Sequence, residues 1–397
     1  MTNSETKKFS QNVSSSYHLK DKGNNAPKLR FKGYNDEWKK VKIGEIYKER
    51  SERGNTNAEL LSVTMNDGVK RRIDIEGKDI SSEDKSNYKS VYIGDMVYNS
   101  MRMWQGANGI SNYDGIVSPA YTVMFPRIEL CNNFIGYLFK YEPLIFLFRR
   151  YSQGLTSDTW NLKYPQIKQL SILIPSLPEQ EKIASFLTLI DKKIEKQKEL
   201  VELLKKYKRG LLSQIFSQKL RFKDDNGNDY PEWKETRLEK ILKIKHGKSQ
   251  KGIECEAGKY PILATGGQIG RTNSYLWNKP CVLIGRKGTI DKPQYMETPF
   301  WTVDTLFYSE VFKENNAKYL YYLFNTINWK KYDESTGVPS LSAKTIERIK
   351  VTLSMNSSEQ HLISKFLSKF DDKIRREESL LNYLQTYKKG LLQQLFI

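Results

Sequence analysis

The strongest constraint on this chain is a long stretch that occurs twice. Residues 176–216 read SLPEQEKIASFLTLIDKKIEKQKELVELLKKYKRGLLSQIF, and NSSEQHLISKFLSKFDDKIRREESLLNYLQTYKKGLLQQLF begins 180 positions later, at Asn356, without any gap between the copies. Similarity of this length and register indicates an internal duplication. The matching pairs include Glu179-Gln180 with Glu359-Gln360, Phe186-Leu187 with Phe366-Leu367, Asp191 with Asp371, and Tyr207-Lys208 with Tyr387-Lys388.

Each copy predicts one long helix. Ser176 and Glu179 in the first copy, and Asn356 and Glu359 in the second, have the spacing of a capping box at a helix start. No Pro or Gly then follows until a glycine near the end of each copy. We therefore expect helices over 176–218 and 356–397.

The apolar residues of both copies alternate by four and three positions, a 3.5-residue repeat typical of a left-handed coiled coil. The seam is interrupted by polar residues at matching places, Gln197 with Glu377 and Lys208 with Lys388. Two unrelated surface helices are the alternative, but the shared register of interruptions favours two helices that pack on each other, with Gln197 and Glu377 fixing the register. The predicted seam residues are Ile183, Leu187, Ile190, Ile194, Val201, Leu204, Ile363, Leu367, Phe370, Ile374, Leu381 and Leu384.

The repeat extends beyond the helices. Leu29-Arg30-Phe31-Lys32 matches Leu220-Arg221-Phe222-Lys223, and Trp38 matches Trp233 after a short insertion. The duplicated unit is thus a leading segment, a globular stretch and a long helix. We expect an α+β fold with two similar globular domains, at 27–175 and 219–355, and two long helices packed as an antiparallel coiled coil with a pseudo-twofold internal repeat.

Within the globular stretches, alternating or β-rich runs predict strands between Gly-, Asn- and Asp-marked turns. The expected strands are 90–98, 121–125, 281–284 and 302–308, and the expected helices are 134–151 and 317–332.

The composition of the chain limits the kinds of partner that it can bind. The 397 residues carry a net charge of +19, which favours binding to a polyanion, most often nucleic acid; a basic surface kept for solubility is the alternative. Cys131, Cys255 and Cys281 form no CxxC, so neither zinc nor disulfides are expected. Residues 1–26 are polar and predict a disordered tail. Without a signal peptide or a run of transmembrane length, we expect a cytoplasmic protein with no membrane contact.

No reaction signature stands out. The sequence has no GxxxxGK[ST] phosphate loop, no HExxH and no Cys/His cluster with ligand spacing, and the glycine-rich piece at 265–270 does not match GxGxxG. We therefore predict no catalytic residue, no metal site and no cofactor in this chain.

The globular stretches do carry hydrogen-bond donors among aromatic and small residues. Arg, Asn, Gln and Thr read base edges, Lys and Arg hold phosphates, and Gly lets the backbone approach. Ordinary polar turns are the alternative for any single residue. The predicted DNA contacts are Asn66, Lys70, Arg102, Gln105 and Asn108 in the first domain, and Gln268, Arg271, Arg286, Lys287 and Thr289 in the second.

The order of LRF segment, variable domain and EQ-headed helix ending in YKKGLLQQLF, all repeated, resembles the specificity subunit of type I restriction-modification systems over residues 27–397. The resemblance implies two target recognition domains that each read half of a bipartite sequence in double-stranded DNA, and helices that set the gap and dock two modification subunits. It further implies S-adenosylmethionine on those methyltransferase subunits, ATP and Mg on restriction subunits that join the complex and translocate DNA, and no catalysis by this chain.

Two other readings remain at this point. A basic coiled-coil scaffold would bind nucleic acid without sequence preference, with an affinity that falls steeply with salt. A nuclease with an unrecognised active site would cleave DNA alone in the presence of metal.

Overall fold

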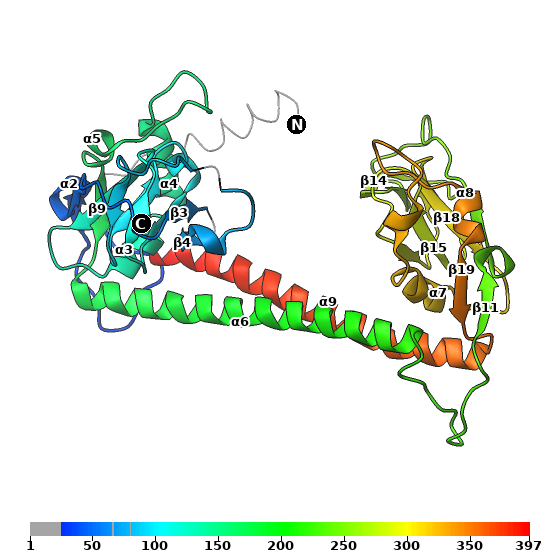
Figure 1. Cartoon of the computed structure of the whole chain (residues 1–397). Coiled ribbons are helices and arrows are strands. Elements are labelled where there is room, and N and C mark those ends of the chain that lie inside the picture. The colour runs from blue at the N-terminus through cyan, green and yellow to red at the C-terminus, as the bar shows by residue number, and fades with distance from the viewer. Residues whose placement is uncertain (1–24, 66, 80) are drawn as a thin grey trace. The chain divides into compact units, whose positions relative to one another are not determined.

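The computed structural model describes residues 25–65, 67–79 and 81–397 (Figure 1). The chain forms two compact units, the residues up to Lys196 together with Leu381–Ile397, and Gln197–Leu380. We call them unit 1 and unit 2. Nearly all of the predicted tail, 1–26, lies outside the described residues. Among the described helices, none combines the length and apolar character needed to cross a membrane.

Unit 1 is built on a four-stranded antiparallel sheet in the order β2-β9-β6-β7. Three two-stranded antiparallel pairs surround it: β1 with β10, β3 with β4, and β5 with β8. The strands are β1 (Lys39–Lys42), β2 (Tyr47–Glu49), β3 (Leu61–Thr64), β4 (Gly68–Arg71), β5 (Lys89–Val91), β6 (Met96–Asn99), β7 (Asn108–Ile110), β8 (Gly115–Val117), β9 (Tyr121–Pro126) and β10 (Ser171–Ile174).

The helices of unit 1 are shorter than the sequence predicts. The single helix expected over 134–151 is two helices, because Pro143 fits the first turn of a new helix but not a helix interior. The strand expected over 90–98 is likewise two strands, separated by a turn in which Gly94 has a φ of +91°. The helical elements are α2 (Ile43–Ile46), η1 (Arg72–Asp74), η2 (Met103–Gln105), α3 (Asn132–Leu138), α4 (Glu142–Tyr151) and α5 (Tyr164–Ile167).

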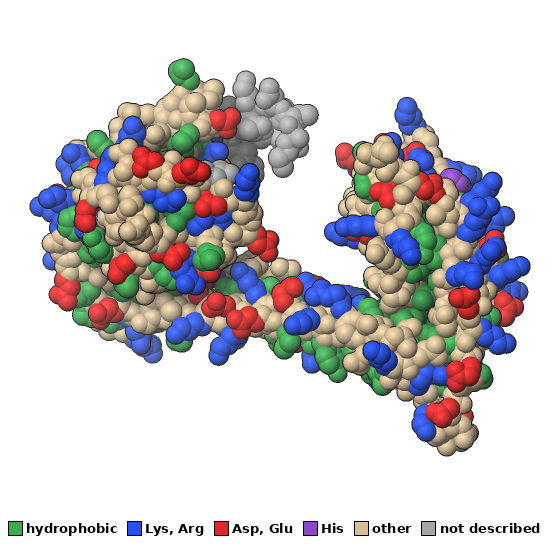
Figure 2. All heavy atoms as spheres, in the orientation of Figure 1, with side chains coloured by type: hydrophobic (Ala, Val, Ile, Leu, Met, Phe, Trp, Pro, Cys, Tyr) green, Lys and Arg blue, Asp and Glu red, His purple; other side chains and the backbone are tan. Residues whose placement is uncertain are grey.

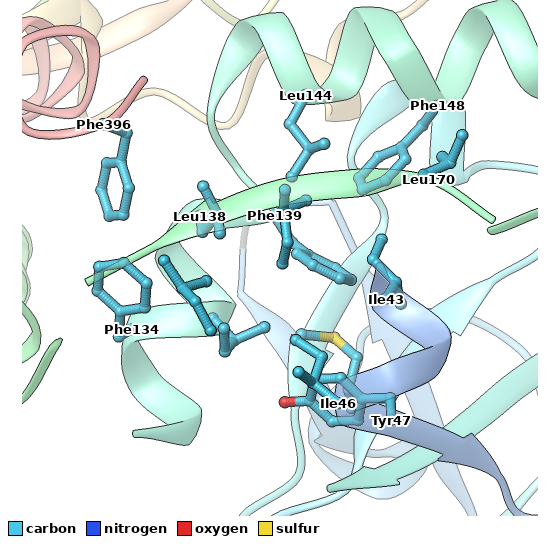
Figure 3. Packing of buried hydrophobic residues seen from close by; sticks show 14 of the residues in the cluster. Ile43, Ile46, Tyr47, Phe134, Leu138, Phe139, Leu144, Phe148, Leu170 and Phe396 are labelled. Carbon is cyan, nitrogen blue, oxygen red and sulfur yellow. The ribbon is translucent and has the colours of Figure 1, made fainter. Parts of the chain in front are cut away.

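One hydrophobic core joins the sheet, the short helices and the ends of both long helices in unit 1 (Figure 3). Phe396, from the C-terminal end of the chain, lies beside Phe134 of α3, with ring centroids 5.2 Å apart. Trp38, from the leading segment, packs edge-on against both rings. The leading segment and the end of the chain therefore share one aromatic core.

Unit 2 repeats this layout. Its four-stranded antiparallel sheet has the order β12-β18-β15-β16, β11 pairs with β19 as β1 pairs with β10, and the hairpin β13-β14 takes the place of β3-β4. β17 pairs with β13 in parallel. The strands are β11 (Lys234–Arg237), β12 (Leu242–Lys245), β13 (Tyr260–Ala264), β14 (Gly267–Thr272), β15 (Cys281–Gly285), β16 (Gln294–Met296), β17 (Trp301–Thr302), β18 (Leu306–Val311) and β19 (Lys350–Leu353).

The helices of unit 2 differ from the expected ones in the same way. The stretch 317–332 contains a helix and a separate 3-10 turn, and the strand expected over 302–308 is divided between β17 and β18. The helical elements are η3 (Leu238–Lys240), α7 (Ala317–Phe324), η4 (Trp329–Tyr332) and α8 (Ala343–Arg348).

The two repeated stretches are the helices α6 (Leu177–Phe216) and α9 (Ser357–Leu395), of 40 and 39 residues. Within unit 2, Gln197 Nε2 donates to Glu377 Oε2 at 2.7 Å, while Lys208, later on α6, pairs with Asp371, earlier on α9. The two helices therefore run antiparallel there, as predicted. Gln197 and Glu377, the first polar interruption of the seam in each helix, are each other's partners.

The predicted seam residues are the inward face of these helices. Nine of the twelve are buried, and Ile190, Phe370 and Leu381 are half-buried. The apolar spacing thus identifies the packed face along both helices.

The glutamates of the expected capping boxes have another role. Asn356 does cap α9, since its Oδ1 accepts from the backbone N–H of Glu359 at 3.0 Å. The carboxylate of Glu179, however, is held by Arg30 of the leading segment, at 2.7 and 2.8 Å, and Trp233 donates to that of Glu359 at 3.0 Å. The capping-box prediction is wrong for both carboxylates, because the leading segments supply stronger partners.

Candidate nucleic-acid interface

In unit 1, two segments that the sequence singled out separately lie together. These are the β3-β4 hairpin and residues 99–108, which run from the last residue of β6 to the first residue of β7 and which we call glycine loop 1. Lys140 joins them, because its Nζ donates to the carbonyl of Met65 in the hairpin turn at 2.9 Å and to that of Gly106 at 2.6 Å. A Cβ on Gly109 would lie 2.8 Å from the Cα of Gly68. Only glycine therefore permits this backbone approach.

Lys140 makes this junction sensitive to pH. Burial, and to a smaller degree the nearby Lys388, lower the pKa of Lys140 from its ordinary value to about 8. The two carbonyl groups that accept from it are dipoles and not full charges, so they do not restore the lost hydration of the ammonium group.

An aromatic and cationic stack supports the outer side of glycine loop 1. The rings of Trp104 and Trp160 meet edge-on at 5.2 Å, and the guanidinium of Arg149 lies over both, 5.9 and 5.2 Å from their centroids. The loop closes through Gly106, whose φ of +85° favours glycine. The loop is thus held in a defined conformation, with the side chains of Arg102 and Gln105 exposed.

Unit 2 makes the same junction with different residues. The β13-β14 hairpin meets residues 285–289, which begin with the last residue of β15 and which we call glycine loop 2. A Cβ on Gly285 would lie 2.1 Å from the carbonyl oxygen of Thr289 and 3.1 Å from Thr265 Cγ2 in the hairpin turn. Gly288, with a φ of +93°, completes the loop. A hairpin tip packed on a glycine-containing loop is therefore common to both units.

The predicted contact residues divide into free and engaged side chains, and Asn66 lies outside the described residues. Lys70, Arg102 and Gln105 in unit 1 have side chains with no hydrogen bond or ion pair among the described residues. In unit 2 the same holds for the exposed Gln268 and Lys287, and for Thr289, which is half-buried.

Three predicted residues are occupied within the protein. Asn108 is fully buried and donates to the carbonyls of Gly106 and Phe139, so it presents no surface to a base, and this prediction is corrected. Arg271 donates to the carbonyls of Gly258 and Lys259. Arg286 pairs with Asp304 at 3.1 Å. An arginine held in this way supports a loop and has fewer donors left for DNA.

A third element adjoins each junction and was missed from the sequence. Residues 152–161 in unit 1 and 333–341 in unit 2, which we call the tip loops, each precede the last short helix of their domain. Leu162 N–H donates to the carbonyl of Ser100, and Leu341 N–H to that of Arg286, both at 2.9 Å. The available signal was a matching pair of Gly- and Ser-containing loops in both repeats, but their lengths differ and no donor cluster marks them.

Basic side chains are common on the surface of both units. Figure 2 shows lysine and arginine side chains over the visible faces of both units, with a concentration along one edge of unit 2. Within the described parts of the chain, no group of three or more His, Cys, Asp or Glu side chains is placed to hold a metal ion. The geometry is suited to contacts with phosphates and base edges.

Comparisons with known proteins agree with this arrangement. The family model for the type I restriction modification DNA specificity domain matches residues 35–205 and 230–386. The specificity subunit of the type I restriction enzyme MjaIX of Methanocaldococcus jannaschii is 29% identical over 150 residues, 35% of this chain and 34% of the relative. The match thus spans about a third of that relative. The putative MjaX specificity subunit of the same organism is 24% identical over 80% of this chain and 81% of its own length.

Solved structures show the same fold. The S subunit of a type I restriction-modification system from M. genitalium superimposes with a TM-score of 0.59 at 20% identity, over 94% of this chain and 99% of that one. A chain from a structural study of complex assembly and conformational transition in a type I R-M system gives a TM-score of 0.56 at 15% identity, over 91% and 98%. The family model covers most of both repeats, and each repeat has the same fold with a hairpin packed on a glycine loop. This chain therefore belongs to the type I restriction modification DNA specificity domain family and carries that domain twice.

Proposed function

We propose that this chain is the DNA specificity subunit of a type I restriction-modification complex, with each unit reading one half of a bipartite target in double-stranded DNA. The observation that carries the proposal is the junction of hairpin, glycine loop and tip loop, built twice on one plan with different side chains. A shared plan supports two readers of the same kind. Different side chains, such as Arg102 and Gln105 against Gln268 and Lys287, support two different half-sites.

The long helices set the gap between the half-sites and dock two modification subunits. Besides its buried seam, each helix exposes a second apolar stripe, and Figure 2 shows hydrophobic side chains on the surface of the helices. Exposed apolar surface of this kind is typical of an interaction site. The stripe residues occupy matching positions of the repeat: Leu200, Leu203 and Tyr207 on α6, and Leu380, Tyr383 and Tyr387 on α9.

The chemistry belongs to the partners under this proposal. The modification subunits bind S-adenosylmethionine and methylate adenine, and restriction subunits that join the complex use ATP and Mg. This chain supplies the choice of sequence, and its own contribution to the rate is the positioning of the target.

The test is to co-express the chain with its candidate modification subunits, add S-adenosylmethionine, and map adenine methylation across a random DNA library. We expect one bipartite motif with a fixed gap and one methylated adenine on each strand. Methylation without a motif, or DNA binding that follows salt alone, would contradict the proposal and leave a basic scaffold.

Single substitutions then assign each half-site to its unit. Arg102→Ala should relax the preference at one position of the first half-site by about 1–3 kcal/mol if Arg102 contacts a base, and leave the second half-site unchanged. Lys287→Ala is the matched change in unit 2 and should affect only the other half. A uniform loss of affinity on all sequences would instead identify either side chain as a phosphate contact.

A further inference from the structure

Each of the two tip loops carries an exposed apolar side chain at its apex. Leu155 in unit 1 is fully exposed, the most exposed of the large hydrophobic residues that the structure describes. Val338 in unit 2 is 56% exposed. A single exposed apolar residue needs no explanation by itself. Here, however, the same feature occupies the same place in two domains whose sequences otherwise differ.

The tip loop of unit 1 is built to hold its apex outward. Gln153 and Asn161 exchange backbone hydrogen bonds of 2.9 and 2.8 Å, and Thr159 Oγ1 donates to the carbonyl of Thr156 at 2.9 Å. Gly154 has a φ of +150°, and a Cβ there would lie 2.7 Å from the carbonyl carbon of Thr159. The apex is thus a closed turn that cannot fold Leu155 back onto the domain without breaking these contacts.

The tip loop of unit 2 is closed by an aspartate. Asp333 Oδ1 accepts from the backbone N–H groups of Ser335 and Ser340 at 3.0 and 2.9 Å, and these bonds hold the pKa of Asp333 below its ordinary value. Glu334 N–H donates to the carbonyl of Ser340 at 3.0 Å. Val338 lies between these closing contacts, as Leu155 does in unit 1.

Each apex adjoins the proposed DNA surface and is accompanied by cations. The C-terminal end of each tip loop is hydrogen-bonded to its glycine loop: Leu162 N–H donates to the carbonyl of Ser100, and Leu341 N–H to that of Arg286. Exposed arginines, Arg102 and Arg149, flank the loop of unit 1 in the described structure, and Lys287 pairs through its backbone with Ser340 in unit 2. An apolar residue with a cation nearby matches a stack of bases between two phosphate backbones better than a uniformly apolar partner.

We propose that Leu155 and Val338 are wedges that insert between base pairs, one in each half-site, and partly unstack them. The proposal rests on the proposed function. It assigns to the tip loops a part in recognition through the deformability of the DNA, because the cost of unstacking depends on the sequence of the base step.

The test uses the complete complex with its modification subunits and a duplex that carries the target found by methylation mapping. A fluorescent adenine analogue, 2-aminopurine, is placed in turn at each position of a half-site other than the methylated adenine. We expect its fluorescence to rise on binding at one step in each half-site. Leu155→Ala should abolish the rise in one half-site and leave the other, and Val338→Ala should do the reverse.

The controls separate insertion from general weakening. Ile128→Ala removes another exposed side chain of unit 1, 49% exposed, and should leave both signals intact. Leu155→Met keeps an apolar wedge and should retain the signal. An unchanged rise in Leu155→Ala, with the complex still bound at its target, would overturn the proposal. A complex that shows no preferred target at all would instead overturn the proposed function.

Discussion

At the scale of single residues, three side chains join each domain to the two long helices. In unit 1, Lys388 of α9 pairs with Asp191 of α6, and Tyr137 of α3 donates to the same carboxylate at 2.8 Å. The lysine also lies over the tyrosine ring, 5.1 Å from its centroid. Burial raises the pKa of this tyrosine, so its hydroxyl remains a donor. Unit 2 makes the same set with Lys208, Asp371 and Tyr322.

These sets explain the second polar interruption of the seam. A lysine at a core position of a coiled coil is costly unless a partner compensates it. The aspartate across the seam and the tyrosine from the domain do so in both units. The lysine is therefore a point at which helix pairing and domain docking depend on each other.

The lowered pKa of Lys140 predicts how the stability of the chain changes with pH. The pKa of its ammonium group is about 8 in the folded chain and about 10.5 when unfolded, so between these values the unfolded chain holds more protons and stability rises with pH. Relative to Lys140→Met, the wild type should gain up to roughly 3 kcal/mol of unfolding free energy between pH 8 and 10.5. Denaturant unfolding at several pH values measures this difference. Lys163→Met, a change at an exposed lysine, should show no such trend, and a flat difference for Lys140 would contradict the prediction.

At the scale of elements, both long helices continue through a glycine. Gly210 and Gly390 lie inside α6 and α9, and a Cβ at either position would meet no atom within 4 Å beyond its own helix and chain neighbours. Alanine is favoured over glycine in a helix interior by about 1 kcal/mol.

Gly210→Ala and Gly390→Ala should therefore each stabilise the chain by about 0.5–1 kcal/mol. The measurement is the denaturant midpoint of each single variant against the wild type. As a matched control, Gly106→Ala, at a φ of +85° and 3.0 Å from Ile145 Cδ1, should destabilise. A loss of stability in both helix variants would mean that the glycines relieve strain that the helix geometry does not show.

The pair of Gln197 and Glu377 leads to a second prediction at this scale. Single buried polar residues fix the register of coiled coils at some cost in stability. Leucine at both positions should raise the unfolding free energy and weaken the selection of one register. In the assembled methyltransferase, the two helices could then pair in more than one register. The gap between the methylated half-sites should therefore take more than one value. An unchanged, single gap in the methylation map would show that register is fixed elsewhere.

The sequence predicts the elements that repeat and misses those that depend on tertiary contact. The long helices and their packed face can be predicted because the apolar residues from Ile183 to Leu384 recur with one regular spacing. The role of Glu179 did not follow, because its partner, Arg30, is distant in sequence. Among the predicted contact residues, Arg102 and Asn108 occupy one loop, yet only the fold places one outside and the other within the core. Composition identifies a loop as polar, but the direction of each side chain is set by packing.

At the scale of the whole molecule, the repeat makes the two domains interchangeable parts. In each domain, a pair of antiparallel strands joins the beginning of the domain to its end. Lys39 pairs with Ile174 in the first domain, and Lys234 pairs with Leu353 in the second. Each meets the long helices through the same lysine, aspartate and tyrosine set. A domain moved between these two strand pairs therefore meets an equivalent set of supporting residues on the long helices, and brings its own hairpin, glycine loop and tip loop.

The last prediction follows from this equivalence. In a chain whose residues 39–174 are replaced by a copy of 234–353, both units present the loops of unit 2, on helices that run antiparallel. Like readers carried on antiparallel helices are expected to read an inverted repeat. The methylated target should become two inverted copies of the second half-site, with the original gap. The reciprocal chain, with 234–353 replaced by 39–174, should give the inverted repeat of the first half-site. Half-sites in direct orientation would contradict this expectation, whereas a target that keeps both original halves would show that recognition lies outside these domains.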